Sequence, residues 1–169
     1  MTRLRERATV DLVRLDVALV RDLVAGTLER PGTWHPQYPT ADTFDAAQLL
    51  LGAYAALGEE PDARTAWWLF AVVVEGTVVG DAGFHGPPPE SGPPEVEIGY
   101  QVVPALRGRG VATRACALLL AHAWRHGAAV VRADAEPENV ASRAVLRANG
   151  FRLTARGDFA VAAPASAAT

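Results

Sequence analysis

Apolar residues recur along the chain with two different periods, and the periods indicate where helices and strands are expected. A short strand-like run at 10–13 precedes an apolar stripe at helical spacing over 17–28. A second helix is predicted over 44–57, with Asp42 or Thr43 as its N-terminal cap. The N-terminal part of the chain therefore predicts one strand followed by two helices.

The middle of the chain has the composition of strands. Residues 67–74 and 77–84 are rich in β-branched and aromatic side chains and are separated by a plausible hairpin turn at 75–76. The segment 86–94 is rich in proline and must be a loop. Residues 96–103 alternate between apolar and polar side chains, which predicts a strand with two different faces.

The second half alternates between helix and strand. A long apolar helix is predicted over 111–126, a buried strand over 129–133 and a short helix over 140–148. Two short strands are expected at 151–153 and 159–162. We find no repeat and no convincing linker, so the pattern predicts a single α/β domain.

Composition narrows the function classes. The formal net charge is −3, which argues against a nucleic-acid binder, and all 16 basic residues are arginine. The single cysteine, Cys116, excludes an internal disulfide and is compatible with a reducing cytoplasm. No apolar stretch approaches the ~20 residues of a membrane span, and residues 1–10 lack the pattern of a signal peptide. We therefore expect a cytoplasmic protein without nucleic-acid or membrane partners.

A glycine-bearing turn, Arg107-Gly108-Arg109-Gly110, lies between a predicted strand and a predicted helix. The first turn of a helix leaves N–H groups unpaired, and the helix dipole adds partial positive charge there. Glycines let the backbone approach a phosphate closely, so this segment favours binding of a pyrophosphate. It lacks the lysine of a P-loop and the third glycine of the dinucleotide fingerprint.

The segment instead resembles the acetyl-CoA signature R/Q-x-x-G-x-G/A of the GCN5-related N-acetyltransferases (GNAT), as Arg107-x-x-Gly110-x-Ala112. Further matches follow in the family's order. Residues 97–100 resemble the family's E-I-G-Y strand, and Asn139-Val140-Ala141-Ser142 with the later Gly150-Phe151 resembles its N-x-x-S … G-F. The resemblance covers about 69–153 and is closest to the branch of ribosomal-protein N-terminal acetyltransferases.

The resemblance implies an α/β GNAT fold, with a mixed central sheet of about six to seven strands flanked by helices. A single N-acetyltransferase domain would occupy 1–169, with acceptor-side helices at about 14–58, an acetyl-CoA-binding core at about 67–153 and short strands and a tail at 154–169. The implied reaction is direct attack of a primary amine, from a protein N-terminus or a small molecule, on acetyl-CoA. The alternative is a catalytically degenerate domain that senses acyl-CoA.

The resemblance also assigns residues to acetyl-CoA. The family's loop amides bind the pyrophosphate, its central strand pairs with the pantetheine arm, and two polar residues near its last helix contact that arm. The corresponding residues here are Val102, Val103, Arg107, Gly108, Arg109, Gly110, Val111, Ala112, Thr113, Asn139 and Ser142.

The candidate bases are two carboxylates. Glu97 is the first, since strand alternation places it on one sheet face, and Asp134 at the end of the next strand is the second. The family's tyrosine acid is absent at 144–146, which leaves the general acid unassigned. A backbone N–H near Tyr100 to Val102 would polarise the thioester carbonyl.

The acceptor side is expected to be lined by Trp34, Tyr38 and Tyr100, because the family's acceptor site lies in these regions. The C-terminus is shorter than the family's usual last strands. The acceptor pocket is therefore either more open or completed by a partner chain in a homodimer. His122 and His126 have the spacing of metal ligands but lack a third ligand, so no metal is expected.

Overall fold

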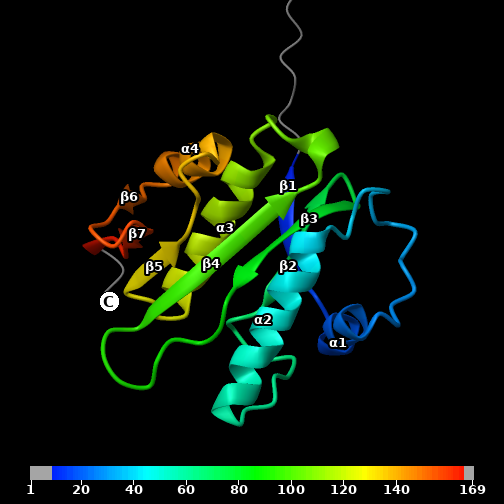
Figure 1. Cartoon of the computed structure of the whole chain (residues 1–169), viewed down its shortest axis with the longest axis horizontal. Coiled ribbons are helices and arrows are strands. Elements are labelled where there is room, and N and C mark those ends of the chain that lie inside the picture. The colour runs from blue at the N-terminus through cyan, green and yellow to red at the C-terminus, as the bar shows by residue number, and fades with distance from the viewer. Residues whose placement is uncertain (1–8, 166–169) are drawn as a thin grey trace, which may run out of the picture.

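The computed structural model describes residues 9–165 and contains a seven-stranded mixed sheet (Figure 1). The strand order is β1-β2-β3-β4-β5-β7-β6, in which β4 and β5 are parallel and every other neighbouring pair is antiparallel. This confirms the predicted fold class. The strands are β1 (Val10–Arg14), β2 (Leu69–Val74), β3 (Thr77–Phe84), β4 (Glu95–Val102), β5 (Val130–Ala133), β6 (Arg152–Leu153) and β7 (Phe159–Ala162).

Helices cover both faces of the sheet. The helix α2 lies in front of the sheet and α3 behind it in Figure 1, and α1 packs against α2. The helices are α1 (Val17–Ala25), α2 (Ala41–Leu57), α3 (Val111–Arg125) and α4 (Val140–Ala148), with a short 3₁₀ turn, η1, at Pro104–Leu106.

Two helix ends lie three residues from their predicted positions, each for a local reason. The helix α1 stops at Ala25 rather than near 28, because Gly26 adopts a left-handed conformation with φ 72°. The helix α2 begins at Ala41 rather than 44, because the hydroxyl of Thr43 accepts the backbone N–H of Thr40 at 3.1 Å. Thr40, and not Asp42 or Thr43, is therefore the capping residue.

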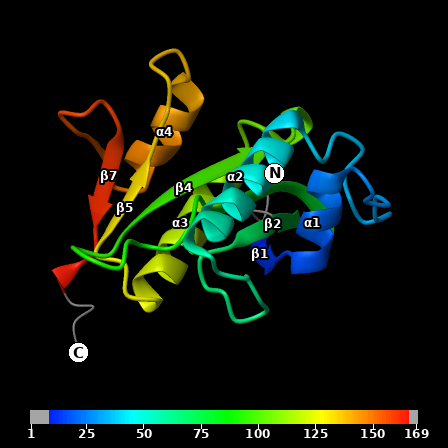
Figure 2. The ribbon, with the colours of Figure 1, turned by 60° about the horizontal axis from the view of Figure 1, so that its bottom comes forward.

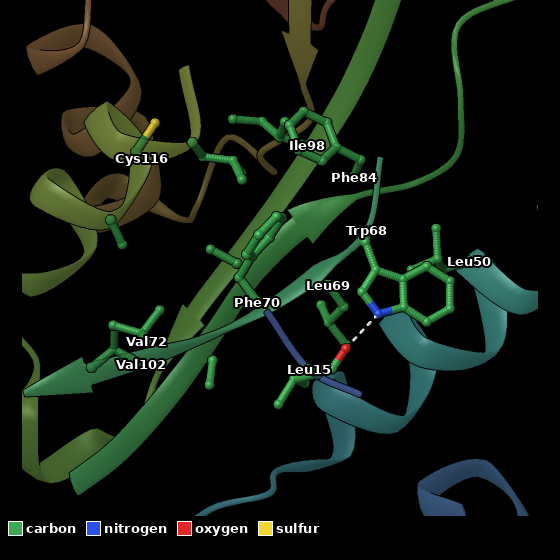
Figure 3. Packing of buried hydrophobic residues seen from close by; sticks show 14 of the residues in the cluster. Leu15, Leu50, Trp68, Leu69, Phe70, Val72, Phe84, Ile98, Val102 and Cys116 are labelled. Atoms are coloured by element: carbon green, nitrogen blue, oxygen red, sulfur yellow. Dashed lines mark hydrogen bonds between the residues drawn. The ribbon is translucent and has the colours of Figure 1, made fainter. Parts of the chain in front are cut away.

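The core is continuous across the sheet and is anchored by Trp68. Its fully buried indole donates a 2.9 Å hydrogen bond to the carbonyl of Leu15, as Figure 3 shows. In β4 the side chains of Val96 and Ile98 are buried while Glu97 is exposed, as the alternation predicts. The core fixes which face of β4 points toward α2.

The strands β4 and β5 separate halfway along β4. Their parallel pairing extends only to Ile98, opposite Ala133, whereas β3 pairs with β4 as far as Val102. In Figure 2, β5, β7 and α4 lean away from the far end of β4. Within residues 9–165, the backbone edge of 99–102 on the β5 side thus has no strand partner.

No helix of the described part of the chain combines the length and apolar character needed to cross a bilayer. Residues 1–8, most of the segment that lacks the pattern of a signal peptide, and residues 166–169 of the tail lie outside the described residues.

Candidate active site

A cavity of about 430 Å³ opens where β4 separates from β5. Its walls come from the end of β4, the turn before α3, the first turn of α3 and one face of α4. It is lined by Tyr100, Gln101, Val102, Leu106, Arg107, Gly108, Gly110, Val111, Ala112, Thr113, Ala141, Ser142 and Val145.

The α3 end of this cavity has the properties of an anion site. The first helical hydrogen bond runs from the N–H of Arg114 to the carbonyl of Gly110 at 3.2 Å, so the three residues between them have no acceptor within the helix. Gly108 and Gly110 adopt φ values of 71° and 75°. No heavy atom lies within 4 Å of the Cβ position at Gly108, so the backbone is open to a ligand.

These features fit a pyrophosphate, and the free edge of β4 fits an extended arm that hydrogen-bonds as an added strand. Most of the residues assigned to acetyl-CoA line the cavity. Three do not. Val103 is buried and donates its N–H to the carbonyl of Val79 at 2.8 Å, and Arg109 does not belong to the lining. Asn139 caps α4 by accepting the N–H of Ser142 at 3.0 Å.

A second cavity, of about 320 Å³, lies between α2, β3 and β4, and we call it the acceptor pocket. It shares Tyr100 and Gln101 with the first cavity, so the two meet on β4. The acceptor pocket is lined by Asp42, Asp45, Ala46, Leu49, Leu69, Asp81, Gly83, Phe84, His85, Gly99, Tyr100 and Gln101.

A hydrogen-bonded network around Asp81 forms one wall of the acceptor pocket. Oδ2 of Asp81 accepts the hydroxyl of Thr43 at 2.8 Å and the amide Nε2 of Gln101 at 2.9 Å. Gln101 also donates to the Thr43 hydroxyl at 2.6 Å, and its Oε1 accepts the hydroxyl of Thr40. The network therefore joins α2 to β3 and β4 beside the point where the cavities meet.

Burial raises the pKa of Asp81 to about 6, and its hydrogen bonds from Thr43 and Gln101 oppose the rise. Tyr38 lies close by. Burial and the charge of Asp81 raise the pKa of the Tyr38 hydroxyl well above its ordinary value. The phenol is therefore neutral throughout the range in which Asp81 titrates.

Of the aromatic residues expected in the acceptor pocket, only Tyr100 lines it. Its hydroxyl lies 3.0 Å from the hydroxyl of Ser142 on α4, and burial raises the pKa of the phenol to about 12. Trp34 and Tyr38 are buried and pack edge to face, with ring centroids 4.9 Å apart. They support the wall of the pocket from inside the core, because their large apolar rings are more stable there than in a polar cavity.

The two candidate bases lie in different places. Oε1 of Glu97 is 3.3 Å from Nδ1 of His85, which lines the acceptor pocket. Asp134 lies in a separate surface pocket with Arg156 and Asp158. Glu97 is therefore connected to the acceptor pocket through His85, whereas Asp134 does not line it.

The residues that give the acceptor pocket its charge were not among those predicted from the sequence. Asp81 is the only charged residue of β3, within an otherwise small and apolar run. A carboxylate at a position expected to be buried is an available signal of function. Asp42, Asp45 and His85 carried no such signal, because nothing local distinguishes them from solvent-exposed residues.

His122 and His126 form no metal site. The ring Nε2 of His122 is 2.8 Å from the carbonyl of Ala66, and the two imidazoles stack with centroids 4.1 Å apart. Within residues 9–165, no three side chains of the metal-binding types are grouped to hold an ion.

Solved structures share this fold over nearly the whole chain. RimL, a ribosomal L7/L12 α-N-protein acetyltransferase solved with coenzyme A, has a TM-score of 0.60 at 20% identity, covering 91% of this chain and 94% of RimL. Mycobacterium smegmatis RimJ, solved with CoA-disulfide, has a TM-score of 0.61 at 26% identity, covering 95% and 87%. The yncA protein of Salmonella typhimurium, solved with acetyl-CoA, has a TM-score of 0.59 at 23% identity, covering 96% and 98%.

No curated protein matches the sequence. The family model for the acetyltransferase (GNAT) domain, however, matches residues 11–152, which include every element that lines the two cavities. The fold, the two cavities that meet on β4 and the family match agree, and the chain belongs to the GNAT family of acetyl-CoA-dependent acetyltransferases.

Proposed function

We propose that the protein transfers the acetyl group of acetyl-CoA to a primary amine held in the acceptor pocket. The observation that carries the proposal is the shared wall of the two cavities at Tyr100 and Gln101. A thioester along β4 and an amine between α2 and β3 would meet there. Acetyl-CoA supplies an activated acyl carbon, and the residues of this chain orient the two partners and exclude water.

The charge of the acceptor pocket supports an amine. Asp42, Asp45 and Asp81 line it, and no lysine or arginine does. An amine is a cation in water at neutral pH, so these carboxylates would attract it before it loses a proton. The acceptor is therefore a protein N-terminus or a small amine, and the similar structure RimL, a ribosomal L7/L12 α-N-protein acetyltransferase, favours an α-amine of a protein.

The cofactor roles rest on the residues that line the first cavity. The N–H groups at the start of α3 would hold the pyrophosphate, the free edge 99–102 of β4 would pair with the pantetheine arm, and Ser142 would contact that arm. A backbone N–H of β4 near Tyr100 would polarise the thioester carbonyl. Glu97 remains a better candidate than Asp134 for a role in proton transfer, because it contacts His85 of the acceptor pocket.

Thiol release from acetyl-CoA tests the proposal. The purified chain is offered a short peptide with a free N-terminus, the same peptide with a blocked N-terminus, and the polyamine spermidine. Release with a free amine above the rate without acceptor is expected, and the blocked peptide should give none. If no free amine releases thiol while acetyl-CoA still raises the melting temperature, the protein is an acyl-CoA sensor and the transferase proposal is wrong.

A further inference from the structure

His85 is held by Glu97 at two points. Its backbone N–H donates to the carbonyl of Glu97 at 2.9 Å, and its ring Nδ1 lies 3.3 Å from the Glu97 carboxylate. A carboxylate accepts only, so in the neutral ring the proton resides on Nδ1 and Nε2 is left as the acceptor. The pair therefore fixes both the position and the tautomer of the imidazole.

Gly99 provides the space that the ring occupies. A Cβ at Gly99 would lie 3.0 Å from Nε2 of His85, closer than nearly all real contacts of such an atom. Nε2 thus lies over β4 at the residue before Tyr100, whose side chain borders both cavities. The glycine of the Glu97-Ile98-Gly99-Tyr100 motif is explained by this close approach.

Glu97 itself is less suited to accept a proton. The hydrogen bond from His85 lowers the pKa of its carboxyl, which makes it a weaker base. Glu97 also lines a different surface pocket, with Leu57 and Pro87. A neutral imidazole whose Nε2 keeps a free lone pair can accept a proton, which is what a general base requires.

The groups that surround His85 from neighbouring elements are acidic. They come from α2, β3 and β4, and no basic residue lines either pocket that His85 borders. These carboxylates favour an ammonium group beside the ring, and no arginine of the two linings competes with that ammonium for Nε2. They are Asp42, Asp45, Asp81, Glu95 and Glu97, of which Glu95 is paired with Arg132 of β5 at 2.8 Å.

We propose, on the basis of the transferase function above, that His85 is the catalytic base of amine acetylation and that Glu97 is its positioning residue. Nε2 takes one proton from the bound ammonium, which frees the nitrogen lone pair. The nitrogen then bonds to the acetyl carbonyl carbon and the bond from that carbon to the CoA sulfur breaks. The second amine proton leaves for the thiolate, and His85 returns its proton to solvent.

The test is the pH dependence of thiol release, with the free-N-terminus peptide as acceptor. His85→Gln should lower kcat at neutral pH by about 10²–10⁴-fold, the usual effect of losing a general base. The loss should shrink at high pH, where the amine is already neutral, and the KM for acetyl-CoA should stay unchanged. His126→Gln, at a histidine that lines neither cavity, should behave as the wild type.

Two further variants separate catalysis from packing. His85→Ala should regain part of its rate when free imidazole is added, which a structural role would not allow. Glu97→Gln keeps a hydrogen-bond acceptor but removes the charge. It should therefore move the acidic limb of the rate–pH profile to lower pH, because the protonated ring loses its charge partner.

Three outcomes overturn the proposal. If His85→Gln retains the wild-type rate and profile while the wild type transfers acetyl groups, His85 is not the base and the proposed function stands. If the acidic limb of the rate–pH profile is unchanged in Glu97→Gln, the positioning role is wrong. If the wild type transfers to no amine but still binds acetyl-CoA, the proposed function fails and the role of His85 fails with it.

Discussion

The hydroxyl of Thr43 donates a 2.8 Å hydrogen bond to Oδ2 of Asp81, which ties the first turn of α2 to the middle of β3. Both side chains are buried, with 0% and 2% of their surface exposed. The contact holds the helix that carries Asp42 and Asp45 against the sheet, so it sets the width of the acceptor pocket. Its strength depends on the charge of one carboxyl.

That charge predicts a pH-dependent stability. The pKa of Asp81 is about 6 in the folded protein and 3.8 for the free carboxyl, so the folded state binds more protons between these values. The contribution of Asp81 to stability therefore falls as the pH rises from about 4 to about 6. Asp81→Asn removes this dependence. The difference in free energy of unfolding, variant minus wild type, should therefore increase by up to about 3 kcal/mol as the pH rises over that range.

Urea unfolding of both proteins at several pH values measures this difference. Asp134→Asn is the matched control, since Asp134 is exposed and lies in another pocket. A constant difference between Asp81→Asn and wild type from pH 4 to 7 would show that Asp81 is not shifted upward by burial.

Two glycines outside the cofactor loop should respond to alanine in opposite directions. A Cβ at Gly80 would lie 2.1 Å from the backbone carbonyl oxygen of Gln101, so Gly80→Ala must force β3 from β4 and should destabilise the protein severely. Gly52 is exposed within α2, with no heavy atom near its Cβ position. Gly52→Ala should stabilise by about 0.5–1 kcal/mol, because alanine favours the helix. Thermal unfolding of the two variants tests both signs.

The cofactor loop can be tested with a pair of valine substitutions that strain the backbone alike. Gly110 caps the N-terminus of α3 and Gly58 caps the C-terminus of α2, with φ values of 75° and 68°. Valine at either position should cost at least about 1–2 kcal/mol of stability. Only Gly110→Val should weaken acetyl-CoA binding, by about tenfold or more, equivalent to about 1.4 kcal/mol.

Isothermal titration with acetyl-CoA distinguishes the two effects in variants that remain folded. S-acetylpantetheine, which lacks the pyrophosphate, should bind the wild type and Gly110→Val with similar affinity. If Gly110→Val and Gly58→Val bind acetyl-CoA with equal affinity, the pyrophosphate does not bind at the start of α3.

Cys116 should report global unfolding. Its side chain is completely buried in α3, and burial raises the pKa of the thiol to about 12, so little thiolate forms at neutral pH. A thiol reagent such as DTNB should therefore label Cys116 only after the protein unfolds. At high reagent concentration the labelling rate should equal the unfolding rate and no longer depend on that concentration. Labelling of the native protein in seconds, in proportion to the reagent, would contradict the burial.

Several features of the site follow from short stretches of sequence. The alternation at 96–103, the glycines at 108 and 110 and the apolar run of α3 predict a strand, an anion-binding turn and a helix in that order. Each depends on interactions within one or two turns of chain, such as side-chain period, positive φ and unpaired N–H groups. The same is true of Asn139, whose short side chain caps its own helix. Local interactions therefore suffice to predict which end of the site would hold the cofactor.

The acceptor side was decided only in three dimensions. Asp81 meets Thr43 across 38 positions of sequence and Gln101 across 20, and both contacts depend on strand register and on the packing of α2. The same packing buries Trp34 and Tyr38. The proline-rich loop reverses the direction of the chain between β3 and β4, which brings Glu97 next to His85. Asp134 sits one strand further along, where the separation of β4 and β5 carries it away from the acceptor pocket. Sequence determined the elements and the glycine-bearing turn before α3, whereas the tertiary structure decided which carboxylates line the acceptor pocket, because burial and charge depend on neighbours in space.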